Sequence, residues 1–312
     1  KDYLAQEIDN IVDGCNGILS RVAQGYPSDL STRDIEDFNR LVLRGLSLPA
    51  DVVAGSVRTH EVSVGRYHGA PAKDCHFLLD RLCEWLNSTD FCFMHDYDIA
   101  CGLLKAIVAH LYLAWIHPFG DGNGRTARLV EFQTLIVVGV PSPAAHLLSN
   151  HYNQTRHEYY RRLAEASSSE DGILSFIRYA VQGFVDGLRD QLAVIRGQQW
   201  DVAWRNYIHE EFGEQVGDRE VRRRRRRLIL DLSTQLNPVP ASAVKNISPR
   251  VAEAYARKSG KTLSRDLDEL ERERLILKTP DGYVANKTLI LAFLPITYRP
   301  DIDENPTPTP AA

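Results

Sequence analysis

The chain has 312 residues, a length that predicts two compact units. Its 44% apolar and 25% charged residues are typical of a globular protein. The formal net charge of −4 excludes a global basic field, so nucleic-acid binding would need a local patch. No uninterrupted apolar stretch reaches the roughly 18 residues of a membrane span, and the charged start KDYLAQEID does not resemble a signal peptide. We therefore expect a cytoplasmic protein without a membrane partner.

The first fifty residues predict two amphipathic helices. Apolar side chains recur with helical spacing in KDYLAQEIDNIVDGCNGILSRVA, which we expect to be interrupted near Gly14 and Gly17. A second helix is expected after an N-cap at Ser31 or Thr32. We assign residues 1–30 to an N-terminal helical segment.

The segment VRTHEVSVGRYHGAP breaks the helical pattern. Valines alternate with polar residues over 61–64 and a glycine follows, which predicts a short β-hairpin. It is one of few strand signals in the first 200 residues.

Two apolar helices flank the stretch HPFGDGNGRTAR, which runs from His117 to Arg128. YDIACGLLKAIVAHLYLAWI precedes it and GRTARLVEFQTLIVVG overlaps its end, and both are apolar on nearly every face, as expected in the middle of a helical bundle. Pro118 and the glycines break the first helix. The second half of the stretch is therefore a helix N-terminus.

The chemistry of these twelve residues favours a phosphate ligand. Glycines turn backbone N–H groups into an anion nest, and a helix N-terminus adds the positive end of its dipole. Arg125 and Arg128 share one helix face and suit a polyphosphate. Asp121 is a hard oxygen ligand for Mg²⁺, and a neutral His117 could take a proton from a hydroxyl. A histidine before a proline is usually only a helix terminus, but the coincidence of all these features favours a functional site.

The stretch HPFGDGNGRTAR resembles the HPFx(D/E)GN(G/K)RxxR signature of Fic domain proteins, with every motif position filled. The similarity extends from about residue 18 to about residue 185, including the hairpin segment and RHEYYRRL. It implies a mainly α fold, a Fic helical bundle with a β-hairpin flap, over residues 31–197. It also implies Mg²⁺-dependent transfer of AMP from ATP to a Ser, Thr or Tyr hydroxyl of a target protein, and automodification.

The resemblance assigns a role to each motif position. His117 would be the general base, Asp121 would hold Mg²⁺ on the α- and β-phosphates, and Phe119 would anchor the loop. Arg128 would pair with the γ-phosphate. The remaining ATP-binding positions would be Gly122, Asn123, Gly124 and Arg125 for the phosphates and Tyr159 or Tyr160 for adenine, with packing alone as the alternative for the tyrosines.

The hairpin would bind the target. An exposed strand edge can pair with an extended peptide through main-chain hydrogen bonds. Val62, Ser63 and Val64 would hold the target hydroxyl opposite His117; the alternative is a plain surface hairpin.

Many Fic proteins carry an inhibitory helix with the pattern (S/T)xxxE(G/N), whose glutamate pairs with the second motif arginine. SRVAQG matches at Ser20 and Gly25 but has Gln24 in place of the glutamate. An uncharged amide would leave Arg128 freer, which predicts weak autoinhibition; an ordinary helix end is the alternative. Ser167 stands where some relatives have asparagine, which leaves the nucleobase preference open.

Beyond a helical linker over 198–220, three short helices and a strand pair turning at 280–282 predict a winged helix-turn-helix domain over 221–298. Residues 299–312 are proline-rich and expected to be disordered. Acidic residues in the candidate recognition helix GKTLSRDLDELERERL disfavour DNA binding. The basic run 222–227 leaves a nucleic-acid contact open, although a solvated face with arginines paired to acids is the preferred interpretation.

The favoured function is thus a protein adenylyltransferase. The alternatives are a DNA-binding regulator with an inactive Fic core and a Fic transferase that uses another nucleotide. A homodimer is left open, and the target protein cannot be read from the sequence.

Overall fold

The structure is a computed structural model of the chain. It divides into two compact units that meet between Asp190 and Gln191. The predicted end of the catalytic domain, residue 197, falls inside helix α9 (Glu170–Glu214), which contributes to both units. The residues that the structure describes are 3–26, 29–64, 67–88, 91, 98–214 and 218–293. The predicted tail, 299–312, lies outside them.

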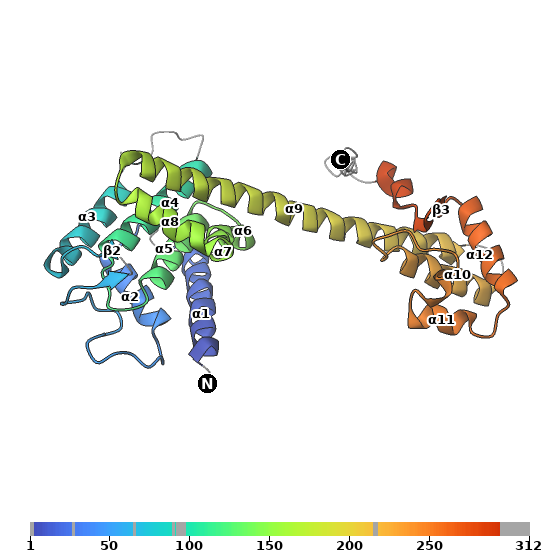
Figure 1. The fold of residues 1–312 in the computed structure, drawn as a ribbon, viewed down its shortest axis with the longest axis horizontal. Coiled ribbons are helices and arrows are strands. Elements are labelled where there is room, and N and C mark those ends of the chain that lie inside the picture. The colour runs from blue at the N-terminus through green and yellow to red at the C-terminus, as the bar shows by residue number, and fades with distance from the viewer. Residues whose placement is uncertain are drawn as a thin grey trace, which may run out of the picture. The chain divides into compact units, whose positions relative to one another are not determined.

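The first unit is mainly α, which confirms the predicted fold class (Figure 1). The predicted hairpin is present as two antiparallel two-residue strands with Ser63 opposite His68. The helices of this unit are α1 (Tyr3–Ala23), α2 (Thr32–Val42), α3 (Cys75–Asn87), α4 (Asp98–Ile116), α5 (Asn123–Val137), α6 (Ser142–Ala145), α7 (Leu147–Gln154), α8 (Arg156–Ala166) and the first part of α9, and the strands are β1 (Ser63–Val64) and β2 (Tyr67–His68).

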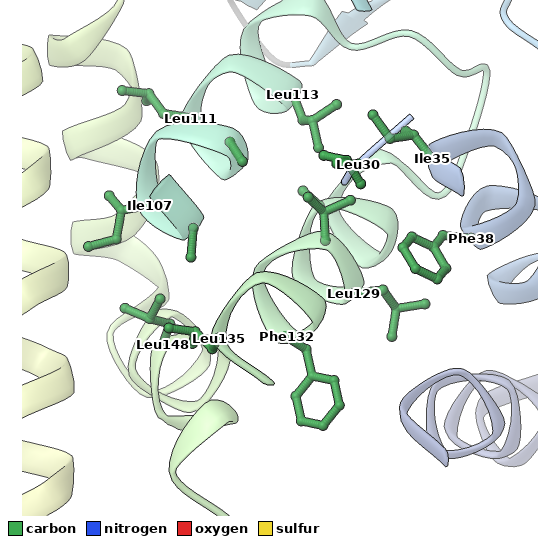
Figure 2. Packing of buried hydrophobic residues seen from close by; sticks show 14 of the residues in the cluster. Leu30, Ile35, Phe38, Ile107, Leu111, Leu113, Leu129, Phe132, Leu135 and Leu148 are labelled. Atoms are coloured by element: carbon green, nitrogen blue, oxygen red, sulfur yellow. The ribbon is translucent and has the colours of Figure 1, made fainter. Parts of the chain in front are cut away.

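Helices α4 and α5 form the centre of the unit, as their all-round apolar sequences predict. Figure 2 shows Leu129 of α5 facing Phe38 of α2, with Leu111 and Leu113 of α4 in the same cluster. Each such side chain contributes roughly 1.5–3 kcal/mol by its burial. Ser31 is the N-cap of α2 and forms a capping box with the residue at helix position N3. The N-cap is therefore one of the two residues that the sequence predicts.

Among the described residues, α4 is the one helix long and apolar enough to cross a membrane by length and composition. Half of its most apolar window is buried inside the unit, and the core helix of a globular protein passes the same test. Its hydropathy is therefore accounted for by its central place in the bundle.

Helix α1 is continuous, whereas the sequence predicts an interruption near Gly14 and Gly17. Gly14 lies where α1 packs on α5 and α2. A Cβ there would come within 2.9 Å of Leu129 Cδ1 and 3.0 Å of Leu41 Cδ2. The glycine thus allows close approach of helices instead of breaking one.

The second unit has the order of helices followed by a hairpin that the sequence predicts; its assignment as a winged helix stays a prediction. Strands β3 and β4 pair antiparallel and turn after Thr279, with Val239 bridging to Tyr283. Its elements include the second part of α9, α10 (Arg219–Leu232), α11 (Pro249–Tyr255), α12 (Gly260–Arg272), β3 (Ile276–Thr279) and β4 (Gly282–Ala285).

Part of the basic run is committed to the core of this unit. Nε of Arg224 and Nε of Arg225 donate to the buried carboxylate of Asp266 at 2.7 and 2.8 Å, and the hydroxyl of Tyr255 donates to it at 2.8 Å. Burial alone raises the pKa of Asp266, but the three hydrogen bonds outweigh it and leave that pKa below its usual value. These two arginines hold α10 to α12.

We predict that Gly14→Val destabilises the protein by about 1–3 kcal/mol, because the added methyl groups overpack the contact with Leu129. Gly17→Val, in the same helix with nothing within 4 Å of its Cβ position, is the matched control. Thermal unfolding followed by circular dichroism measures both. Equal melting temperatures for the two variants would contradict the close packing of α1.

A second prediction concerns Asp266→Asn, which leaves two cations without their buried anion and should cost about 3–5 kcal/mol at neutral pH. Asp268→Asn, an exposed position on α12, should change stability by less than about 0.5 kcal/mol. Because the folded-state pKa of Asp266 is lowered, its contribution is present above the unfolded pKa of about 3.9 and is lost as the pH falls through the folded value. Hydrogen exchange of peptides from α10 and α12, at neutral and acidic pH, should show that dependence in the wild type and not in Asp266→Asn.

Candidate active site

The loop from His117 to Gly122 joins the end of α4 to the start of α5. The backbone N–H of His117 still donates to Leu113 O at 3.0 Å, so this residue closes the last turn of α4. Its φ of 49° lies in the left-handed region, which a non-glycine residue rarely occupies and which is frequent at functional sites. Gly122, the N-cap of α5, also has a left-handed φ, 78°. The main chain therefore turns sharply at both ends of the loop.

The Asn123 side chain shapes this loop. Its Oδ1 accepts from Phe119 N at 2.9 Å and its Nδ2 donates to Phe119 O at 2.7 Å. One N–H of the amide remains, and Asn123 lines the cavity described below, so its donation to phosphates stays a prediction. The side chain of Phe119 is buried in the core and holds the loop against the bundle.

A second amide, Asn39 of α2, holds the acidic part of the loop. Its Nδ2 donates to Asp121 O at 2.9 Å, and its Oδ1 accepts from Gly55 N at 2.9 Å. The buried Asn39 thus fixes the main chain beside Gly122. The sequence analysis missed it, because a lone asparagine within an amphipathic helix gives no local signal.

A cavity of about 490 Å³ opens over the N-terminus of α5. The structure brings most of the predicted catalytic, metal and phosphate-binding residues to this cavity. Arg128 reaches it with an Nε that is buried and has no hydrogen-bond partner in the described part of the chain. A buried guanidinium nitrogen without an acceptor indicates an anionic ligand. The lining comprises His117, Gly120, Asp121, Gly122, Asn123, Gly124, Arg125, Arg128, Tyr152, Asn153, Arg156, Tyr159 and Tyr160.

His117 is set up as a neutral base. Burial lowers its pKa below the usual value; the contact with Ala114 O and the nearby Asp121 oppose this, and the Arg58 cation reinforces it. The Nδ1 atom lies 3.4 Å from Ala114 O, an acceptor, which places the proton on Nδ1 and the free electron pair on Nε2. The imidazole can therefore accept a proton at neutral pH.

Arg125 is bound by two carboxylates. Its Nη2 lies 3.1 Å from Asp121 Oδ1, and its Nη1 forms an ion pair with Glu7 of α1. The sequence analysis missed Glu7, which is 118 positions from Arg125 and is brought there by the packing of α1 on α5. Arg125 is thus oriented before any ligand enters.

The carboxylate of Asp121 is the metal-ligand candidate. The described residues contain no group of three or more His, Cys, Asp or Glu side chains that could hold a metal ion. A single carboxylate on a phosphate-sized cavity nevertheless fits Mg²⁺, which commonly binds through one or two carboxylates together with substrate phosphates.

A second cavity of about 530 Å³ borders the same loop and is largely apolar. Tyr67 of the hairpin, Trp115 of α4 and Leu163 of α8 line it together with both predicted tyrosines. The two tyrosines differ. Tyr159 is 6% exposed and shares a 2.7 Å hydrogen bond with His110 Nε2, whereas Tyr160 is 49% exposed.

Tyr159 belongs to a buried polar network that supports the cavity floor. The hydroxyl of Tyr152 donates to Glu131 Oε1 at 3.1 Å, and Glu131 Oε2 lies 3.2 Å from His110 Nδ1. Burial raises the pKa of Tyr159 and of Tyr152, so both phenols stay protonated. Packing is therefore part of the role of Tyr159, and Tyr160 offers the more accessible ring. Ser167 lies elsewhere, capping α8 with its hydroxyl on Ala164 O.

The base of the hairpin is held to the end of α4 by the main chain, since Ala70 N donates to Ile116 O at 3.2 Å. Within the hairpin, Gly69 N donates to Val62 O at 3.2 Å, and Ser63 Oγ lies 2.8 Å from His68 Nδ1. The side chain of Val64 lies outside the described residues. Arg58, which the sequence analysis also missed, lies between this hairpin and the loop.

Ser20, Gln24 and Gly25 do not line either cavity at the loop, and the weak autoinhibition expected from Gln24 stays a prediction. The last turn of α1 lines a small cavity with Gln133 and Val137, in the second half of α5. Since Glu7 contacts Arg125 near the start of α5, the two helices run in the same direction. The rise along α5 from Arg128 is about 8 Å to Gln133 and about 13 Å to Val137, and Gln24 and Arg128 share no hydrogen bond in the described part of the chain.

One further arginine was missed although its signal is local. Arg156 lines the phosphate-sized cavity, and its Cζ lies 5.7 Å from the centroid of the Tyr160 ring. It stands in RHEYYRRL, the segment that also supplies the two tyrosines.

A family model and curated relatives both match part of this chain. Residues 29–135 match the model of the Fic/DOC family. A protein adenylyltransferase Fic from Nematostella vectensis is 32% identical over 149 residues, which are 48% of this chain and 31% of that protein. A protein adenylyltransferase fic-1 from Caenorhabditis elegans is 31% identical over 154 residues, 49% of this chain and 27% of that protein. The matched region thus spans less than a third of these curated relatives.

Solved structures of similar proteins are Fic proteins too. A Fic family protein from Desulfovibrio desulfuricans has a TM-score of 0.49 at 20% identity, covering 91% of this chain and 76% of that one. A Fic domain containing signaling protein from Bacteroides thetaiotaomicron has a TM-score of 0.42 at 21% identity, covering 59% and 69%.

We predict that His117 titrates below its usual pKa of about 6.5 in the free protein. Asp121→Asn should lower that pKa further, because Asp121 is the carboxylate that stabilises the imidazolium. Histidine-selective NMR across pH 4–9, with the signal assigned by His117→Gln, measures both. A titration above 6.5, or an upward shift in Asp121→Asn, would contradict the described surroundings.

Proposed function

We propose that the chain is a protein adenylyltransferase, on the premise of the match of residues 29–135 to the Fic/DOC family model. It would move AMP from ATP to a Ser, Thr or Tyr hydroxyl of a target protein, and to its own hydroxyls. The names of the relatives support this activity, and their identity of about 32% covers roughly half of the chain.

The observation that carries the proposal is the meeting of a neutral base with a buried cation on one cavity. His117 presents Nε2, and Arg128 brings a buried Nε without an acceptor, both at the N-terminus of α5. A triphosphate would supply acceptors to Arg128 and to the main-chain N–H groups of that N-terminus. Arg156 adds a third cation to the lining besides Arg125.

Each residue has a part in the transfer. Nε2 of His117 takes the proton of the target hydroxyl as its oxygen attacks the α-phosphorus; the new P–O bond forms and the bond to the leaving pyrophosphate breaks. Arg128 and Arg125 bind the phosphates, and the ion pair with Glu7 keeps the Arg125 side chain in place. Asp121 would hold Mg²⁺, which neutralises phosphate charge when bound. The apolar cavity with Tyr160 suits a nucleobase ring.

The hairpin would receive the target as an added strand. Main-chain pairing along Val62 and Ser63 would bring an extended peptide past the imidazole. Weak autoinhibition would follow from Gln24, which lacks the carboxylate that could pair with Arg128.

The test is incubation of the protein with α-³²P-labelled ATP and Mg²⁺. Wild type should label protein, and His117→Ala should lose about 10²–10⁴-fold, the usual contribution of a general base. His76→Ala, an exposed histidine on α3, is the matched control and should label like wild type. Label from γ-³²P-ATP would indicate phosphorylation, label from α-labelled CTP alone another nucleotide, and equal labelling by His117→Ala would overturn the assignment.

A further inference from the structure

Arg58 is a fully buried arginine whose guanidinium donates hydrogen bonds to main-chain carbonyl groups. Its Nε donates to His117 O at 2.8 Å and its Nη1 to His60 O at 2.7 Å. Its Nη2 donates to Ala70 O and, at 3.4 Å, to Ile116 O. A buried cation is retained only where such acceptors surround it.

These acceptors belong to two separate segments. Ile116 and His117 end α4 and begin the catalytic loop, whereas His60 and Ala70 lie at the two ends of the hairpin. The backbone agrees, since Arg58 N donates to Pro118 O at 2.9 Å. The guanidinium therefore forms a bridge between the hairpin and the loop.

The approach of the two segments is close. A Cβ on Gly69 would lie 2.9 Å from Arg58 Nη2 and 3.1 Å from His117 Cβ. Gly69, at the end of the hairpin, therefore packs directly against the side chains of His117 and Arg58. A small shift of the hairpin would change its distance to the imidazole.

We propose that Arg58 is a positioning residue that fixes the register between the target-binding hairpin and His117. The inference rests on the proposed function for its catalytic consequence, but the bridge itself is a structural claim. The bridge acts on the protein substrate and not on the nucleotide, because Arg58 does not line the cavity at the start of α5.

The charge of Arg58 has a second effect. It lowers the pKa of His117, alongside burial and against Asp121. The other charged and titratable groups that line the two cavities with the imidazole are Arg125 and Arg128 of α5, Tyr152 of α7, Arg156, Tyr159 and Tyr160 of α8, Tyr67 of the hairpin and His110 of α4. Glu61 lies 3.7 Å from Arg58 Nη1 and is largely exposed.

Two variants separate geometry from charge. Arg58→Met removes the donors and the charge, whereas Arg58→Lys keeps the charge with a head group that cannot span both segments. Arg44→Met, a surface arginine of the same unit paired with Asp13, is the matched control.

Hydrogen exchange of the wild type and the variants tests the bridge without any need for activity. Arg58→Met and Arg58→Lys should exchange the amides of Gly69 and Ala70 at least 10-fold faster, while peptides from α5 and the melting temperature of Arg58→Lys stay near wild type. Unchanged exchange at the hairpin in both variants overturns the proposal, even if the protein transfers no AMP. Loss of protection throughout the first unit in Arg58→Lys also overturns it, since that outcome marks a merely structural residue.

Kinetics test the consequence. Both Arg58 variants should lose about 10–100-fold in the rate of automodification with α-labelled ATP, because a misplacement of about 1 Å can cost 10²-fold, while the dissociation constant for ATP stays within about twofold. The acid limb of the pH profile should move to higher pH in Arg58→Met, where the cation no longer depresses the His117 pKa, and stay in place in Arg58→Lys. Equal losses in ATP binding and in transfer would contradict a role confined to the protein substrate.

Discussion

The site depends on one local interaction, the closure of the loop by the Asn123 side chain on the main chain of Phe119. The two hydrogen bonds satisfy a buried N–H and a buried C=O that no secondary structure could satisfy at this sharp turn. With Phe119 in the core, the loop is held against the bundle, and a cavity opens over the start of α5. An amide buried in this way contributes by fixing the geometry of the loop.

The charges around this loop follow from the same enclosure. Taking a side chain out of water favours the neutral form of His117 and makes an unpaired cation such as Arg128 costly. Ion pairs with Asp121 and Glu7 offset the desolvation cost of Arg125, whereas Arg128 keeps a buried nitrogen without an acceptor in the described residues. Two arginines three positions apart thus differ in their readiness for an anion. The difference arises from α1, which provides an acid for only one of them.

The second unit shows the opposite use of arginine. Within the basic run, Arg224 and Arg225 converge on Asp266, whose desolvation cost is outweighed by their hydrogen bonds and that of Tyr255. Asp266, one of the acids that make α12 look unsuited to DNA in the sequence, is buried under two of the arginines that make α10 look suited to it. Part of the apparent basic patch is therefore an internal ion-pair network.

The sequence by itself determined the central part of the protein. The motif His117 to Arg128, the two apolar helices around it, the hairpin and the cap of α2 are local patterns, because each depends on neighbours a few positions away. Only the tertiary structure decided which distant residues complete the site. Glu7, Asn39 and Arg58 reach the loop from far along the chain, and nothing near them in sequence marks their partners. The packing of α1 on α5 was unreadable for the same reason, since it depends on contacts between distant residues such as Gly14 and Leu129.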